Sequence, residues 1–244
     1  HGDPAVRQRA KRRHLRQPQT GMVLAGMAGL LGTSALLNMA VDPPGSVLLT
    51  ALPLLQGIGM AGNIDGTRLH FSLWLLMLLP AFAGGVVEDL TQRLRVSSRM
   101  LLTLISGLLA WALLGVSVPQ LGFAWVDGLW GAWPGLGMAL AVLAVTGLPH
   151  AFNIIDGYNG LAGSVALVVC LALAHVALQV GDRELAAVAV TLAAATAGFL
   201  VWNYPRGLIF AGDAGAYLWG LLIAVLSLLL VQRHPIVSPW FPML

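Results

Sequence analysis

Long apolar runs alternate with short polar segments along most of this chain. A helix needs about 20 mainly apolar residues to cross a bilayer, and seven runs are interpreted as such spans: 21–40, 72–87, 99–116, 135–152, 161–180, 185–202 and 215–231. The pattern therefore predicts an all-α polytopic bundle of transmembrane helices with about seven spans. A further stretch, 47–62, is short and rich in glycine, so we expect it to be interfacial, re-entrant or tilted without crossing.

Composition places nearly the whole chain in the membrane. Of its 244 residues, 58% are hydrophobic and 9% are charged, whereas soluble domains carry about 25% charged residues. We therefore expect a single membrane domain over 1–244, with a basic cytoplasmic segment at 1–20 and the bundle at 21–244. The one cysteine, Cys170, lies in an apolar run and cannot form an intramolecular disulfide. Because the chain begins at His1 and ends as a new apolar run begins, we expect it to be truncated at both ends.

Lysine and arginine are distributed unequally between the two sides of the predicted bundle. If the N-terminus is cytoplasmic, ten of the 13 fall on that side, and only Arg68, Arg183 and Arg233 fall on the other. Cytoplasmic loops carry an excess of these residues, so the bias predicts loops 88–98, 153–160 and 203–214 on the cytoplasmic face of a bacterial inner membrane. The basic run before residue 20 is interpreted as an anchor to the lipid bilayer, and no nucleic-acid partner is expected.

Acidic residues mark each of these three loops. Glu88 and Asp89 end one span, Asp156 follows another, and Asp213 lies between glycines before a third. A carboxylate beside hydrocarbon is costly, so it is a functional candidate by default. Each also has a structural alternative: Glu88 and Asp89 as a solvated span end, Asp156 as a helix cap or turn, and Asp213 as an ordinary turn.

The chemistry of these loops favours phosphoryl transfer. Hard cations such as Mg²⁺ prefer carboxylate oxygens and are often held together with substrate phosphates. Arg99 and Arg206 lie beside the acids and suit an anionic substrate. A metal, arginines and glycines at a membrane edge fit a reaction between a soluble nucleotide and a lipid phosphate, in which the protein positions groups and stabilises charge.

Three segments, in order, resemble the polyprenyl-phosphate N-acetylhexosamine-1-phosphate transferases, also called membrane glycosyltransferase family 4. They are Glu88-Asp89-Leu-Thr-Gln-Arg-Leu-Arg-Val-Ser-Ser-Arg99, His150-Ala-Phe-Asn153-Ile-Ile-Asp156-Gly157-Tyr-Asn159-Gly160-Leu161 and Asn203-Tyr-Pro205-Arg-Gly-Leu-Ile-Phe210-Ala-Gly212-Asp213-Ala-Gly215. The segment Arg233-His-Pro-Ile-Val-Ser-Pro-Trp-Phe further resembles the branch that makes O-antigen and surface polysaccharides.

The resemblance implies transfer of a sugar-1-phosphate from a UDP-sugar to undecaprenyl phosphate, with release of UMP and with Mg²⁺ or Mn²⁺ as cofactor. Such a reaction would start a lipopolysaccharide O-antigen or another cell-wall glycan, and a homodimer is a further expectation.

The resemblance also implies residue roles. Glu88, Asp89 and Asp156 would be catalytic, and Asp213 and Asp156 would hold the metal. The remaining implied positions share substrate binding: Asn153, Arg99, Arg206, Asn159 and His150.

Three departures from the family pattern keep an alternative open. His150 stands where the family usually has Asn, which replaces an amide with a group that titrates near neutral pH. The N-terminal loop motif is degraded to His14-Leu-Arg-Gln-Pro18-Gln-Thr-Gly21-Met22, and the family's C-terminal histidine loop is missing. The chain would then be a catalytically impaired homologue. An ion-coupled transporter, with Asp156 and Asp213 as ion sites, is a second alternative.

Overall fold

The computed structural model describes residues 71–133 and 135–241 of the chain. These residues form seven helices and no strand, which confirms the predicted all-α class. The helices are α5 (Phe71–Thr91), α6 (Val96–Leu114), α7 (Ala124–Ala132), α8 (Leu136–Ile155), α9 (Leu161–Gln179), α10 (Arg183–Asn203) and α11 (Gly212–Arg233). The predicted span 21–40, the stretch 47–62 and the basic segment 1–20 lie outside the described residues.

Six of the described helices are long and apolar enough to cross a membrane. They correspond one to one to the six predicted spans between residues 72 and 231, so the protein is a multi-pass membrane protein. The sequence pattern did not predict α7, whose segment we interpreted as an aromatic belt. That short helix is preceded by a turn that Asp127 closes, because its carboxylate accepts the N–H groups of Leu121 at 2.7 Å and Gly122 at 3.0 Å.

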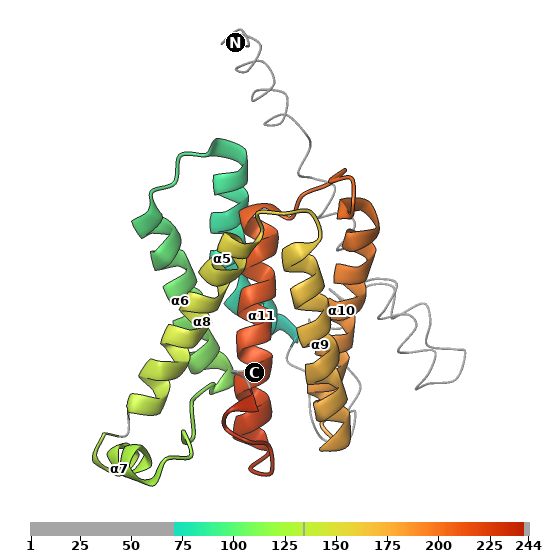
Figure 1. The fold of residues 1–244 in the computed structure, drawn as a ribbon. Helices are drawn as coiled ribbons and strands as arrows, with labels where there is room; N and C mark the ends of the chain where they lie inside the picture. The colour runs from blue at the N-terminus through green and yellow to red at the C-terminus, as the bar shows by residue number, and fades with distance from the viewer. Residues whose placement is uncertain (1–70, 134, 242–244) are drawn as a thin grey trace, which may run out of the picture.

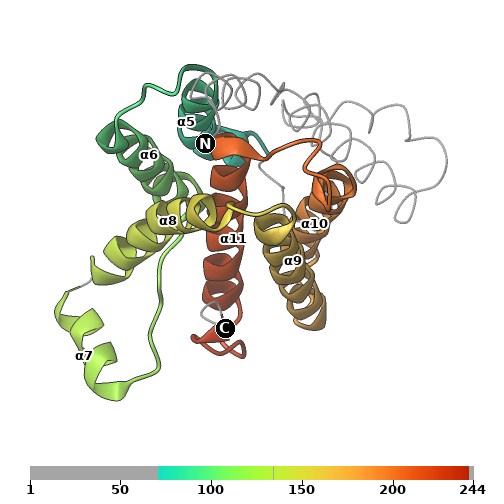
Figure 2. The same cartoon turned by 45° about the horizontal axis from the view of Figure 1, so that its top comes forward.

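Helix α11 lies at the centre of the bundle, with α5, α6 and α8 on one side and α9 and α10 on the other (Figures 1 and 2). Of its apolar stretch, 83% is buried, against 22–39% in the other spanning helices. Glycines allow the close approach: a Cβ on Gly220 would lie 2.4 Å from the backbone of Pro149, and one on Gly85 would lie 2.4 Å from Cα of Ala214.

The three segments that carry the predicted site come together at one end of the bundle (Figure 1). The α5–α6, α8–α9 and α10–α11 connections lie there, whereas α7, the α9–α10 turn and the end of α11 lie at the other end. At that other end, Asp182 accepts hydrogen bonds from His234 Nε2 at 3.0 Å and from Arg233 Nη1 at 3.4 Å. These contacts join the α9–α10 turn to the end of α11.

Candidate active site

Helix ends, rather than free loops, carry most of the candidate residues. Helix α5 continues to Thr91, α8 to Ile155 and α10 to Asn203, while α11 begins at Gly212. Glu88, Asp89, Asn153 and Asp213 therefore lie in terminal helical turns. The helical backbone hydrogen bonds continue past the last apolar residues, so the polar side chains sit on rigid elements.

Asp89 joins α5 to the first turn of α11. Its Oδ1 accepts the backbone N–H of Asp213 at 2.8 Å, and its Oδ2 accepts that of Ala214 at 3.1 Å. The first N–H groups of a helix have no partner within the helix, and a negative charge there is stabilising. Gly212, at φ +66°, leaves room for this contact, since a Cβ there would meet the Asp89 carboxylate at 2.5 Å. Asp89 thus holds Asp213 in place through the backbone.

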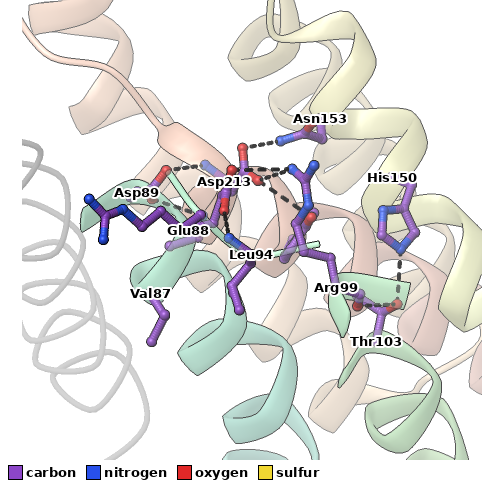
Figure 3. A network of polar contacts seen from close by, with 12 residues as sticks. Val87, Glu88, Asp89, Leu94, Arg99, Thr103, His150, Asn153 and Asp213 are labelled. Atoms are coloured by element: carbon purple, nitrogen blue, oxygen red, sulfur yellow. Dashed lines mark hydrogen bonds and ion pairs between the residues drawn. The ribbon is translucent and has the colours of Figure 1, made fainter. Parts of the chain in front are cut away.

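Asp213 is the hub of the network in Figure 3. Its Oδ2 accepts Nη1 of Arg99 at 2.9 Å, and its Oδ1 accepts Nδ2 of Asn153 at 2.6 Å. Arg99 also lies 3.8 Å from Glu88, whose other oxygen accepts the N–H of Leu94 at 2.8 Å and so orders the turn between α5 and α6. Helices α6, α8 and α11 therefore meet at the Asp213 carboxylate, and α5 joins them through the contacts of Glu88 with Arg99 and of Asp89 with the backbone of α11.

Asp156, just after α8, differs from the other acids. Its carboxylate accepts no hydrogen bond from the described residues, whereas those of Glu88, Asp89 and Asp213 each accept at least one. Burial raises the pKa of Asp156 to about 6, and the negative charges of Asp213 and Asp89 act in the same direction. Asp156 is the carboxylate left available to a ligand.

Asn203 ties the second and third segments together. Its Oδ1 accepts the N–H of Gly160 at 2.5 Å, and its Nδ2 donates to the carbonyl of Ile209 at 2.8 Å. Asn159 adds a bond to the carbonyl of Pro205 at 3.2 Å. Asn159 therefore contacts the α10–α11 connection rather than the Asp213 network, and Arg206 is exposed on that connection. Substrate contact by these last two residues stays a prediction.

His150 lies one turn below the network and brings in two residues that the sequence analysis missed. Its Nε2 lies 2.9 Å from Thr103 Oγ1, and its ring meets that of Tyr217 edge to face at 5.3 Å. The spacing along the sequence could have indicated them. Thr103 lies four residues after Arg99, and Tyr217 lies four residues after Asp213, so each pair shares one helix face.

The donor set fits a magnesium ion held partly by substrate. Oxygen atoms dominate the site, which has four carboxylates: Glu88, Asp89, Asp156 and Asp213. Among the described residues one cation, Arg99, pairs with them, and it contacts only Glu88 and Asp213. Between residues 71 and 241, leaving out residue 134, no three Asp, Glu, His or Cys side chains form a metal cage. Mg²⁺ seldom uses an all-protein cage and takes one or two carboxylates with water and phosphate. Excess negative charge and oxygen donors therefore suit that mode of binding.

Sequence comparison places this site in a known group of proteins. The profile of glycosyl transferase family 4 matches residues 71–231, which include every residue of the site. The chain is 30% identical over 238 residues to a phospho-N-acetylmuramoyl-pentapeptide-transferase of Moorella thermoacetica, covering 96% of this chain and 68% of that protein.

Two further relatives act on other substrates, as their names state. A probable undecaprenyl-phosphate N-acetylglucosaminyl 1-phosphate transferase of Bacillus subtilis is 36% identical over 100 residues, or 41% of this chain and 26% of that protein. A decaprenyl-phosphate N-acetylglucosaminephosphotransferase of Mycobacterium tuberculosis is 30% identical over 217 residues, or 84% of this chain and 48% of that protein. The chain thus spans between a quarter and two thirds of these curated relatives.

Proposed function

Since the chain belongs to glycosyl transferase family 4, we propose that it transfers a sugar-1-phosphate from a UDP-sugar to undecaprenyl phosphate and releases UMP. An oxygen of the lipid phosphate attacks the β-phosphorus of the UDP-sugar. The bond from that phosphorus to the oxygen bridging the two phosphates breaks, and UMP departs with that oxygen. The product is a lipid-linked sugar diphosphate on the cytoplasmic side of a bacterial inner membrane.

The observation that carries this proposal is the state of Asp156. It is a half-buried carboxylate, free of described hydrogen-bond donors, and the charges of Asp213 and Asp89 act on it. A carboxylate so placed is stabilised by a cation or by a proton. Asp156 begins the α8–α9 connection, which lies at one end of the bundle (Figure 1). That location also favours an enzyme over a transporter, because transporters typically bind their ions near the bilayer midplane.

The residues around Asp156 supply the remaining roles. Asp156 and Asp213 would hold Mg²⁺, which supplies charge neutralisation of the diphosphate. Arg99 is the cation of the network, and its guanidinium suits a phosphate oxygen as well as it suits Asp213. Asn153 orients Asp213, and Asp89 fixes the start of α11. Glu88 and Asp89 together form the wall of the site on the α5 side.

The relatives point to two classes of donor sugar. Their names describe transfer of N-acetylglucosamine phosphate and of phospho-N-acetylmuramoyl-pentapeptide. We propose an N-acetylhexosamine donor for this chain and test it beside the muramoyl-pentapeptide donor. Initiation of an O-antigen or a related surface glycan follows only if the N-acetylhexosamine donor is used.

The test is UMP release from each UDP-sugar with undecaprenyl phosphate, by the longest natural form of the protein in detergent. Release should require lipid and Mg²⁺, stop with EDTA, and fall about 100-fold or more in Asp156→Asn, as when an electrostatic group of an active site is removed. Asp127→Asn is the matched control, because Asp127 lies on α7 at the other end of the bundle. If neither donor gives UMP under these conditions, the transferase proposal is wrong, and an impaired homologue becomes the better interpretation.

A further inference from the structure

Two layers of side chains lie one above the other on α6, α8 and α11. The upper layer is Arg99, Asn153 and Asp213, the hydrogen-bonded network described above. The lower layer is Thr103, His150 and Tyr217, and we call it the supporting layer. Each member of the supporting layer lies three or four residues from its counterpart on the same helix, which places it on the same face one turn deeper in the bundle.

The supporting layer is continuous, with two buried members and a half-buried His150. Thr103 is 0% exposed and Tyr217 is 1% exposed. His150 lies between them, with Nε2 2.9 Å from the Thr103 hydroxyl and its ring edge to face with the Tyr217 ring at 5.3 Å. The layer therefore joins the same three helices that the network joins, through a separate set of contacts.

Hydrogen bonding within the supporting layer favours one tautomer of the His150 ring. The Thr103 hydroxyl lies 3.0 Å from the carbonyl of Met100 and 3.2 Å from that of Arg99, so its single proton is engaged by the backbone of its own helix. Its oxygen is then left as an acceptor, an arrangement that favours the tautomer of His150 with the proton on Nε2. The other ring nitrogen, Nδ1, lies on the side of the ring that faces Arg99 (Figure 3). An unprotonated nitrogen is favoured beside a guanidinium, which agrees with this tautomer.

The layer also contacts the network directly. The Tyr217 hydroxyl faces Oδ2 of Asp213 at 3.5 Å, a long contact, on the same oxygen that accepts Arg99 at 2.9 Å. The Thr103 hydroxyl also donates to the carbonyl of Arg99 itself, at 3.2 Å. Movement in the supporting layer would therefore displace both partners of the Arg99–Asp213 pair.

We propose that Thr103, His150 and Tyr217 are positioning residues, which hold Arg99 and Asp213 in register for the transfer reaction. This inference rests on the proposed function. Groups that orient the ligands of an active site typically change activity by about 10–100-fold when they are removed. The residues need no contact with substrate to have this effect.

The test uses variants that remove one hydroxyl and keep the shape. Thr103→Val and Tyr217→Phe should each lower kcat for UMP release about 10-fold, with the KM of the UDP-sugar almost unchanged. Thr196→Val is the matched control. Thr196 is 1% exposed, donates to the carbonyl of Leu192 at 2.7 Å and accepts a ring N–H from Trp219 at 2.9 Å, but lies between α10 and α11 away from the site.

A readout independent of turnover separates this inference from the proposed function. The ¹⁵N shifts of the His150 ring, measured well above the ordinary histidine pKa of about 6.5, should show a proton on Nε2 in the natural protein and a changed tautomer population in Thr103→Val. Equal kcat in Thr103→Val, Tyr217→Phe and the control would overturn the proposal, as would a kcat loss fully explained by less folded protein. If no donor gives UMP, the proposed transferase function is wrong. An unchanged His150 tautomer in Thr103→Val would in addition overturn the proposed role of the supporting layer.

Discussion

Substitution of Gly85 by alanine adds one methyl group at the point where α5 crosses the start of α11. The new Cβ would lie 2.4 Å from Cα of Ala214, 2.5 Å from its nitrogen and 2.9 Å from the carbonyl carbon of Asp213. All three are backbone atoms, so no side-chain rotation relieves the contact. Carbon atoms pack at about 3.5 Å or more, so the two helices must separate by roughly 1 Å.

That separation acts on stability and on the site together. Overpacking of this kind costs about 1–3 kcal/mol. The bonds from Asp89 to the first turn of α11, now 2.8 and 3.1 Å, would lengthen to about 4 Å, beyond hydrogen-bond range. Losing a helix cap costs a further ~0.5–2 kcal/mol. A misplacement of about 1 Å at a catalytic group lowers the rate about 100-fold, so UMP release should fall by that factor although no charge has changed.

Gly84→Ala is the matched control, because it makes the same change at the adjacent residue of α5. The three atoms nearest its Cβ would all belong to the side chain of Leu102, the closest being the tip at 2.7 Å, and a flexible side-chain tip moves more readily than backbone. The gain in helix propensity is equal at the two positions, so the difference between the variants isolates the helix contact. Thermal unfolding in detergent measures the loss of stability, which lowers the melting temperature by about 2–4 °C per kcal/mol. UMP release measures the effect on the site. Equal melting temperatures and equal rates in the two variants would refute the close contact between α5 and α11.

Two further predictions concern the polar contacts outside the network. Asn203→Leu leaves the N–H of Gly160 and the carbonyl of Ile209 without their partner, which costs about 1–3 kcal/mol for each buried group. The variant should therefore have a lower melting temperature and slower UMP release. Asn203→Asp should lose less stability and activity because it keeps the acceptor, and equal losses in the two variants would contradict this reasoning. At the opposite end of the bundle, burial of Asp182 raises the pKa of its carboxyl group. Hydrogen bonds from the backbone N–H of Leu185 and from the side chains of His234 and Arg233 outweigh that effect, so the pKa is lowered. The stability from Asp182 is therefore present above the unfolded pKa of about 3.9 and is lost as the pH falls through the lower folded value. Melting curves should show a larger loss between pH ~5 and ~3 for the natural protein than for Asp182→Asn, and parallel curves would exclude this contribution.

The location of the described spans follows from the sequence alone. Apolar runs of sufficient length have one stable solution in a bilayer, because a helix satisfies its own backbone hydrogen bonds where no water is present. The six spans from residue 72 onward agree with the helices for that reason. The ends of the helices did not follow from the runs: Glu88, Asn153 and Asp213 lie in helical turns beyond the apolar residues, because helix formation does not stop at the edge of the hydrocarbon.

The nature of the site residues also follows from the sequence, since a carboxylate kept beside hydrocarbon is costly and is therefore a functional candidate. Which of them meet was decided by the tertiary structure. Helix α11 runs through the centre and brings Asp213 against Arg99, 114 residues earlier, and against Asn153, 60 residues earlier. The hydropathy pattern does not specify which helices are neighbours, so it could not separate Asn159 and Arg206 from that network. Nor could it find Thr103 and Tyr217, two residues inside apolar runs whose hydroxyl groups gain a role only when three helices pack together.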